Sequence, residues 1–379
     1  MERNDRDRLL RQLAEWQTQR GVLSVSVNVD PADRGRAWWI TLRDQLRNLD
    51  ASTPPHEAKR AFEAACNRVL DRFPEHSPPP EGRGHVGFVD VAEKPTEVWR
   101  SMQIPPRRTE VVHLPRPRLG PLIEAFNDGP RVGVVLVSSE RVRLLEWELG
   151  VIRQLEEREI VLWSLDWRER KSERSVPGAG EWTSASGRDQ FGQRLEANRQ
   201  RFLQEAGTLV RARRQERDWQ HVVAFGPGQT VTELAEGVGV DADRLHSVAQ
   251  DLIAAREGDV AARVEVEIQE VNRNRGFALV REIEEAIGAA TGAVLGPQDA
   301  LKALDGGRVR HLVFDPERDH DAELEDAEAA VAETDGNRVP LLEQLIERAV
   351  LTGAEVTPIR GEPATRLEPY QGVAALLRY

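Results

Sequence analysis

Two apolar runs in the middle of the chain, RVGVVLVSS (131–139) and HVVAFGPG (221–228), most restrict what it can fold into. Continuous apolar runs of this length between turn residues are typical of strands buried on both faces of a sheet. A long helical pattern from about 187 to 214 separates them. This order of strand, helix and strand predicts an α/β layer domain, which we place at residues 118–258.

The same domain is predicted to contain two further strands and a second helix. VRLLEWELG (142–150) and EIVLWSLDW (159–167) are expected to pair with the buried strands, and TVTELAEGVG (230–239) indicates a helix capped by Thr230. The preceding GPGQT (226–230) lies where phosphate-binding turns occur. It lacks the ending of a P-loop and the spacing of a dinucleotide fold, so we expect an ordinary strand-to-helix turn.

The residues before this domain predict an N-terminal α+β domain, residues 1–117. GVLSVSVNVDP (21–31) alternates apolar and polar residues, which indicates a half-buried strand. Helices are expected over 36–49 and 57–73, with the tryptophans at 38 and 39 in the core rather than stacked on bases. Three further runs are expected to be strands of a meander: HVGFVDV, EVWRSMQI and TEVVHLP.

Prolines mark the first domain boundary, because Pro115, Pro117 and Pro121 cannot lie in a central strand. The third domain, residues 259–379, opens with one long helical pattern. Helical and strand runs then alternate: PQDALKAL, RVRHLVFD, PLLEQLIERAVLTG, AEVTPI and GVAALLRY. This alternation predicts a compact α/β sandwich.

The charge of the chain limits its partners. Its 379 residues include 52 basic and 64 acidic side chains, a net charge of −12, which argues against a protein that coats DNA or other nucleic acid non-specifically. Contact with RNA must therefore be local. The first residues are charged where a secretory signal would be apolar, and no apolar run approaches the length of a membrane span. We therefore expect a soluble cytoplasmic protein without a membrane partner.

Several kinds of chemistry lack their usual motifs. Cys66 is the only cysteine, which excludes an intrachain disulfide, and we expect it to be a core residue on a helix. The eight histidines include no H-x-x-x-H pair, and no serine lies in a G-x-S-x-G elbow. The acidic run DPERDHDAELEDAE (315–328) has His320 where a calcium loop requires glycine, so it predicts a solvated loop. No metal and no cofactor are expected.

Arginines are concentrated in the long central helix and around it, although the whole chain is acidic. Arg194 and Arg201 are seven residues apart and share one helix face. An apolar stripe is expected to dock the helix: Phe191, Leu195, Phe202 and Ala206. An ordinary surface helix and an RNA-binding helix explain this pattern equally well.

In the long central helix and in the last third of the chain, the sequence resembles the archaeo-eukaryotic class-I release factors and Pelota, with their divergent bacterial relatives. TGAVLGPQDALKALDGGRVRHLVF (291–314) is similar to the family's turn, helix and strand, and GVAALLRY to its closing strand. Phe191, Arg199 and Phe202 match the spacing on the helix that follows the family's catalytic Gly-Gly-Gln loop. The resemblance implies an RNase-H-like central domain and an L7Ae-like C-terminal α-β-α sandwich.

Two departures from the family concern its functional loops. The matched loop, 182–190, is predicted to form a tip that contains Ser184, Ala185, Ser186 and Gly187, with the first three where Gly-Gly-Gln stands in the family. The glutamine that orients water onto the peptidyl-tRNA ester is therefore missing there. Gln190 and Gln193 are the candidate substitutes. The family's stop-codon reader, Asn-Ile-Lys-Ser, is also missing.

The resemblance implies a factor that binds the ribosomal A site. The candidate partners are rRNA, tRNA and a translational GTPase, and the RNA-binding candidates are Arg188, Arg194, Arg199 and Arg201. The missing Gly-Gly-Gln favours a non-hydrolytic hibernation or stress factor. The alternatives are a release or rescue factor that hydrolyses peptidyl-tRNA and an α/β stress protein unrelated to RNA.

Overall fold

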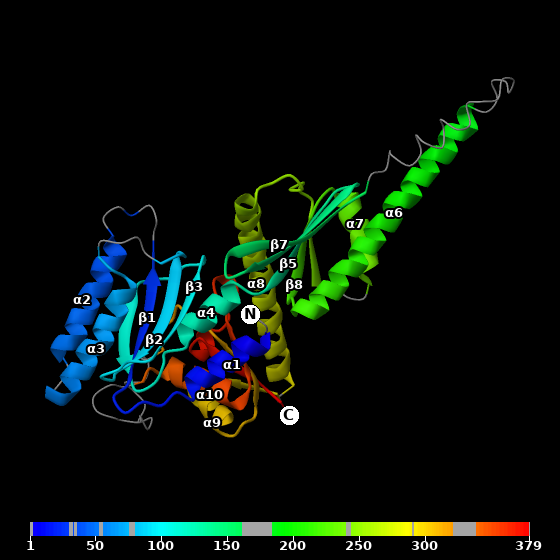
Figure 1. Cartoon of the computed structure of the whole chain (residues 1–379). Coiled ribbons are helices and arrows are strands. Elements are labelled where there is room, and N and C mark those ends of the chain that lie inside the picture. Colours follow the sequence, from blue (N-terminus) through cyan, green and yellow to red (C-terminus); the bar gives the residue numbers. More distant parts are fainter. Residues whose placement is uncertain are drawn as a thin grey trace. The chain divides into compact units, whose positions relative to one another are not determined.

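The computed structural model describes residues 3–29, 33, 36–52, 56–75, 80–160, 184–239, 244–289, 292–320 and 339–378. Contacts divide the chain into two compact units. Unit 1 comprises residues 1–129 and 268–379, and unit 2 comprises residues 130–267. Figure 1 shows the sheets and helices of each unit. The mixed α/β fold expected from the sequence is confirmed, whereas the division into three domains stays a prediction.

The first sheet of unit 1 has four antiparallel strands in the order β3-β2-β1-β4. Their bounds are β1 Val22–Asn28, β2 Gly84–Asp90, β3 Glu97–Met102 and β4 Glu110–Leu114. Helices α2 (Ala37–Ser52) and α3 (His56–Arg72) pack on this sheet (Figure 1), and α1 spans Arg3–Ala14. As predicted, Trp38, Trp39 and Cys66 are buried in the core between these helices and the sheet.

Two details of this sheet differ from the prediction. First, β1 is buried on both faces rather than on one, because its polar face is also covered. The hydroxyl of Ser24 accepts a hydrogen bond from the amide of Arg118 (2.9 Å), and that of Ser26 donates one to the carbonyl of Arg108 (3.2 Å). Second, the strands do not form a meander, since β4 pairs with β1 and not with β3.

The second sheet of unit 1 has the order β10-β13-β11-β12. Its strands are β10 Ala293–Leu295, β11 Val309–Phe314, β12 Glu355–Pro358 and β13 Val373–Leu377, and only the β11–β12 pair is parallel. Helices α9 (Pro297–Asp305) and α10 (Leu341–Thr352) contact its strands. The short helices α11 (Glu362–Thr365) and η3 (Glu368–Tyr370) precede β13. Helices α9 and α10 and the three longer strands were predicted, whereas α11, η3 and the short β10 were not.

Unit 2 is built on a five-stranded sheet in the order β7-β6-β5-β8-β9. The strands are β5 Val132–Val137, β6 Arg141–Glu148, β7 Val151–Glu159, β8 His221–Phe225 and β9 Leu245–Val248. The predicted buried strands β5 and β8 pair in parallel at its centre, and every residue of β5 is buried. Helices α6 (Ser184–Arg217) and α7 (Gly228–Val238) share one hydrophobic core with this sheet.

Three predictions in unit 2 were wrong or lie outside the described residues. The edge strand β7 is VIRQLEERE, which was missed because the charged edge lacks the apolar pattern of a buried strand. Residues 161–167 of the predicted strand EIVLWSLDW lie outside the described residues. Thr230 is not the cap of α7, because the helix begins two residues earlier with Pro227 at the N-cap position, and Thr230 is buried inside it.

Two further helices lie near the limits of the two units, and the sequence predicted only one of them. The long predicted helix is α8 (Glu257–Gly288), whose first residues belong to unit 2 and whose residues from Ile268 belong to unit 1. The short helix α4 (Gly120–Asp128) was not predicted, since prolines dominate the sequence before it. Among the described helices, none is both long and apolar enough to cross a membrane.

Candidate nucleic-acid interface

The predicted tip residues begin helix α6 in the structure. The backbone is helical from Ser184, so residues 184–190 of the predicted loop form the first turns of a helix, while residues 182–183 lie outside the described residues. No proline interrupts the segment, which contains several residues of good helix propensity. The side chains before Gly192, including those of Arg188 and Gln190, also lie outside the described part. Their assigned role stays a prediction.

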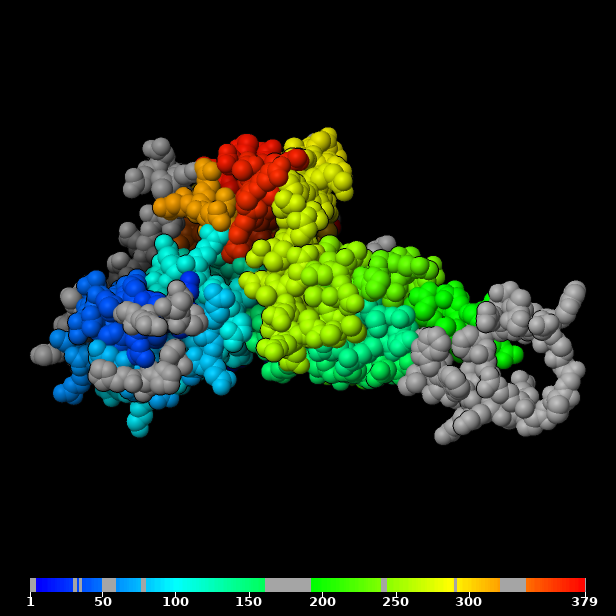
Figure 2. All heavy atoms as spheres, turned by 90° about the horizontal axis from the view of Figure 1, so that it is seen from above, coloured from blue at the N-terminus to red at the C-terminus, as the bar shows by residue number. Residues whose placement is uncertain are grey.

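The next two and a half turns of α6 are largely exposed. The side chains of Gln193, Arg194 and Arg201 are exposed, and only Leu195 and Arg199 are half-buried between residues 192 and 201. Figure 2 shows the green atoms of α6 at the surface beside the yellow-green atoms of α7. A helix so exposed on most sides is not held by a core there, so its polar side chains are available to a partner.

The candidate Arg199 lies differently from its neighbours. Its Nη2 atom lies 2.6 Å from Glu196 Oε1 on the same helix and 2.7 Å from Glu233 Oε1 on α7. Only 14% of the Arg199 side chain is exposed. The hydrogen bonds to Glu196 and Glu233 raise the pKa of the Arg199 guanidinium. The structure thus separates the four RNA-binding candidates into exposed Arg194 and Arg201, ion-paired Arg199, and Arg188, whose side chain is not described.

Two glycines bring α6 and α7 into close contact. A Cβ added to Gly207 would lie 2.5 Å from the carbonyl carbon of Gly237, so only glycine fits at this crossing. Phe202 and Ala206 of the predicted apolar stripe are buried, and Leu195 is half-buried. The stripe prediction is therefore confirmed for its second half. The sequence offered no signal for the glycine pair, because the two residues are thirty positions apart.

The last turns of α6 carry arginines that are paired with acids of the sheet. Arg213 binds Glu156 on β7 (3.3 Å), and Arg217 lies 3.6 Å from Glu146 on β6. Glu146 also accepts a hydrogen bond from the indole of buried Trp219 (2.9 Å). Part of the basic character of this segment is therefore neutralised within unit 2, whereas exposed Arg194 and Arg201, for which the described residues show no ion pair, lie nearer the start of α6.

The turn GPGQT connects β8 to α7, as predicted. Gly228 begins α7, and a Cβ there would meet no atom within 4 Å. The space beside Gly228 is therefore open, but the turn GPGQT has no charged side chain. Among the described residues, no group of three or more His, Cys, Asp or Glu side chains could hold a metal ion.

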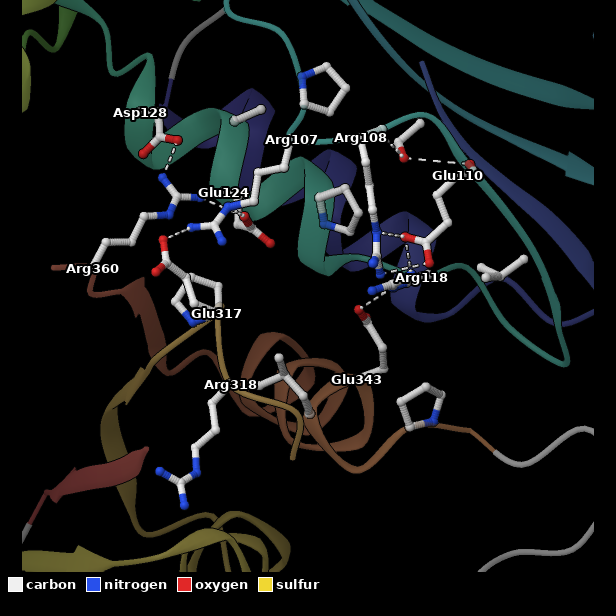
Figure 3. Close-up of a pocket in the computed structure, with 18 of the residues that line it drawn as sticks. Arg107, Arg108, Glu110, Arg118, Glu124, Asp128, Glu317, Arg318, Glu343 and Arg360 are labelled. Carbon is white, nitrogen blue, oxygen red and sulfur yellow. Dashed lines mark hydrogen bonds and ion pairs between the residues drawn. The ribbon is translucent and has the colours of Figure 1, made fainter. Parts of the chain in front are cut away.

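Unit 1 contains a cavity of about 540 Å³ between segments that are far apart in the sequence. Figure 3 shows that its charged side chains point toward one another: Arg118 toward Glu343, Arg107 toward Glu124 and Glu317, and Arg360 toward Asp128. Each of these guanidinium groups therefore already has a carboxylate partner. The lining is balanced in charge and gives no preference for an anionic or a cationic ligand.

A comparison with protein families found a match within unit 2. Residues 130–265 match the family described as bacterial archaeo-eukaryotic release factor family 5. Within these residues the chain resembles the archaeo-eukaryotic release factors. The matched residues coincide with unit 2, which contains α6. The resemblance derived from the sequence is thereby confirmed for these residues. No curated protein matches the chain.

Solved structures of release factors and their relatives also match, at low similarity. An archaeal translation termination factor aRF1 is 20% identical over 100% of this chain and 99% of its own, with a TM-score of 0.27. Pelota from Archaeoglobus fulgidus is 15% identical over 78% of this chain and 79% of its own (TM-score 0.35). Dom34 from S. cerevisiae, a translation termination-like factor interacting with Hbs1, is 10% identical over 78% and 80% (TM-score 0.41).

Proposed function

We propose that this protein is a ribosome-associated factor that binds the A site through the first half of α6 and does not appreciably hydrolyse peptidyl-tRNA. The observation that carries the proposal is the exposure of Arg194 and Arg201 on the helix of the family-matched segment. Guanidinium groups bind phosphate through two parallel hydrogen bonds, so two exposed arginines seven residues apart are suited to an RNA backbone. A function on the ribosome implies a cytoplasmic location.

A local basic helix is compatible with the acidic character of the whole chain. Binding that depends on a few phosphate contacts needs positive charge only where RNA is approached, and it is strongly dependent on salt. The net charge of −12 disfavours binding elsewhere on the surface. The proposed mode of action is therefore occupation of a site on the ribosome, as expected of a hibernation or stress factor.

The start of α6 supports binding without hydrolysis. Water attack on the peptidyl-tRNA ester requires a side chain that positions the water within hydrogen-bond reach of the reacting carbonyl. Ser184 and Ala185 stand where the family has flexible glycines, and the backbone there is already helical. Gln190 lies within the same helix, so its side chain could reach the matched position only if the first turns unwound. We therefore expect occupancy rather than catalysis.

The binding test is co-sedimentation of the purified protein with ribosomes at increasing salt. The double variant Arg194→Glu, Arg201→Glu is expected to bind at least ten-fold more weakly, with a salt slope lowered by about 1–2. The matched control is Arg153→Glu, Arg256→Glu, which changes the same charge at exposed residues of unit 2 away from this part of α6. Equal loss in both variants would contradict the proposal. The absence of binding by the wild-type protein would favour an α/β stress protein unrelated to RNA.

The hydrolysis test uses the same fractions, with ribosomes that carry peptidyl-tRNA and an empty A site. Wild-type protein is expected to release no peptide above background. Release that is lost in Gln190→Ala or Gln193→Ala would instead assign a release or rescue activity. A translational GTPase partner is tested separately, by adding candidate GTPases and measuring whether ribosome affinity increases.

A further inference from the structure

We infer that Arg199 is a positioning residue. Its ion pair with Glu233 fixes the direction in which the exposed first half of α6 projects beyond the packed part of unit 2. This inference rests on the proposed function, because it gives that half of α6 a defined orientation toward its partner. It reassigns a residue that spacing alone predicted to contact RNA.

The ion pair between Arg199 and Glu233 is mostly shielded from water. Their side chains are 14% and 16% exposed, and Arg199 Nη2 lies 2.7 Å from Glu233 Oε1. The same oxygen accepts a hydrogen bond from Gln229 (3.1 Å), whereas the buried Oε2 atom has no hydrogen-bond partner among the described residues. Removing Arg199 would therefore leave the half-buried Glu233 carboxylate without the cation that binds it. Removing Glu233 would leave Arg199 paired only with Glu196 on its own helix, so that the tie to α7 is lost.

The crossing at Gly207 and Gly237 supplies a second fixed point. There the two helix backbones touch, since any added Cβ would overlap the partner helix. Residues 199 and 207 are eight positions apart, or about 12 Å along the helix axis. Between these two positions Phe202, Leu203 and Ala206 are buried in the core of unit 2, so the axis of α6 is fixed as far as Phe202. The ion pair of Arg199 with Glu233 lies at the end of this packed part and sets the angle at which the exposed turns continue.

The helix beyond Arg199 makes its angle important. From Arg199 to the first residue of α6, Ser184, the helix extends about 22 Å. A tilt of about 10° at the anchor would therefore displace the start of the helix by about 4 Å, which exceeds the range of a hydrogen bond. A factor that docks this helix into an RNA site needs the anchor even though the anchor touches no RNA.

Substitution of Glu233 distinguishes positioning from direct contact. Glu233→Gln removes a negative charge next to Arg199 and releases its guanidinium from the ion pair with α7, while Glu196 still binds it. If Arg199 bound phosphate directly, ribosome affinity would rise. If Arg199 positions α6, affinity falls about three- to ten-fold while the salt slope is unchanged, because no phosphate contact is lost. Glu236→Gln is the matched control, because it removes the same charge from an exposed residue of α7, the helix that also carries Glu233. Its ribosome affinity is expected to equal that of the wild type or to rise slightly.

The charge exchange Arg199→Glu, Glu233→Arg provides the rescue. It restores the ion pair in reverse, so affinity is expected to return to within about two-fold of wild type although residue 199 is now acidic. A direct phosphate contact could not be rescued in this way. Unchanged or tighter binding by Glu233→Gln, or no recovery in the exchange, would overturn the inference.

A second measurement does not depend on ribosomes. Spin labels at Gln193→Cys and Arg153→Cys, with Cys66 replaced by Ala, report the distance between exposed sites on α6 and β7. A narrow distance distribution is expected in the wild-type background and in the charge exchange, and a broad one in Glu233→Gln. Broadening without any wild-type ribosome binding would leave the positioning role intact and remove the proposed function. A narrow distribution in Glu233→Gln would remove the positioning role alone.

Discussion

The carboxylate of Glu343, at the start of α10, accepts a hydrogen bond from the amide of Leu119, immediately before α4, over 2.8 Å. The amide of Gly120 and the guanidinium of Arg118 bind the same carboxylate. Glu343 therefore satisfies amides at the start of a helix that lies 224 positions away in the sequence. These contacts join the two segments of unit 1, and Figure 3 shows the ion pair of Glu343 with Arg118 among them.

Removal of this carboxylate should loosen unit 1. Glu343→Ala leaves the amides of Leu119 and Gly120 without their acceptor and half-buried Arg118 with Glu110 as its remaining carboxylate, so we expect a loss of about 3–5 kcal/mol in the free energy of unfolding. Hydrogen-exchange mass spectrometry should show faster exchange in the peptide that contains α4. Glu285→Ala, at a site where 73% of the side chain is exposed, is the control and should change exchange little. Unaltered exchange around α4 would contradict the role of Glu343.

A glycine of β5 should be irreplaceable because of a tryptophan. The ring of Trp219 lies flat against Gly133, and a Cβ there would overlap the ring. Gly133→Ala is therefore expected to displace Trp219 from its hydrogen bond to Glu146, at a cost of about 1–3 kcal/mol. A changed tryptophan fluorescence spectrum and a lower melting temperature would report this. Gly192→Ala, in an open stretch of α6, should be neutral or stabilising.

The buried Arg143 should not tolerate replacement by lysine. Its Nη1 atom donates to the carbonyls of Ile253 and Ala255 (3.0 and 2.9 Å), while its Nε atom donates to Gln154 (2.8 Å). A lysine ammonium group cannot donate to all three acceptors at once, so Arg143→Lys should lower the free energy of unfolding by about 1–3 kcal/mol. Urea unfolding measures the effect. Arg141→Lys is the control on the same strand, and equal costs for the two changes would show that the fork of Arg143 is not needed.

Acid should destabilise unit 1 through His311. Burial lowers the pKa of His311 from 6.5 to about 4, and its Nε2 atom lies 2.8 Å from the Thr357 hydroxyl. Between these two pH values the unfolded chain binds a proton that the folded chain does not, so stability is complete above pH 6.5 and falls toward pH 4. From pH 7 to pH 5 the loss should be about 2 kcal/mol. In His311→Gln, urea midpoints at the two pH values should differ less; an equal difference would exclude His311 as the cause.

Local sequence patterns determined most of the elements of this protein. The apolar runs of β5 and β8, the periodicity of α8 and the tryptophans of α2 were sufficient, because burial selects apolar side chains at the period of the element. The same patterns failed at the charged edge strand β7, which has no apolar period. They also failed at α4, where the prolines indicated a boundary although Leu122, Ile123 and Phe126 follow the helical period. The resemblance to release factors also came from the sequence, through order and spacing along α6 and over residues 291–314.

The tertiary structure decided which arginines of α6 are available to a partner. Arg194 and Arg199 have the same chemistry and lie on one helix, and only the position of Glu233 on α7 distinguishes an exposed cation from an anchored one. The same holds for Glu343, whose partners at Leu119 and Gly120 are brought near by the fold alone. Sequence patterns report contacts at the period of a helix or strand, whereas these ion pairs join distant segments. Their partners are therefore fixed only when the segments pack together.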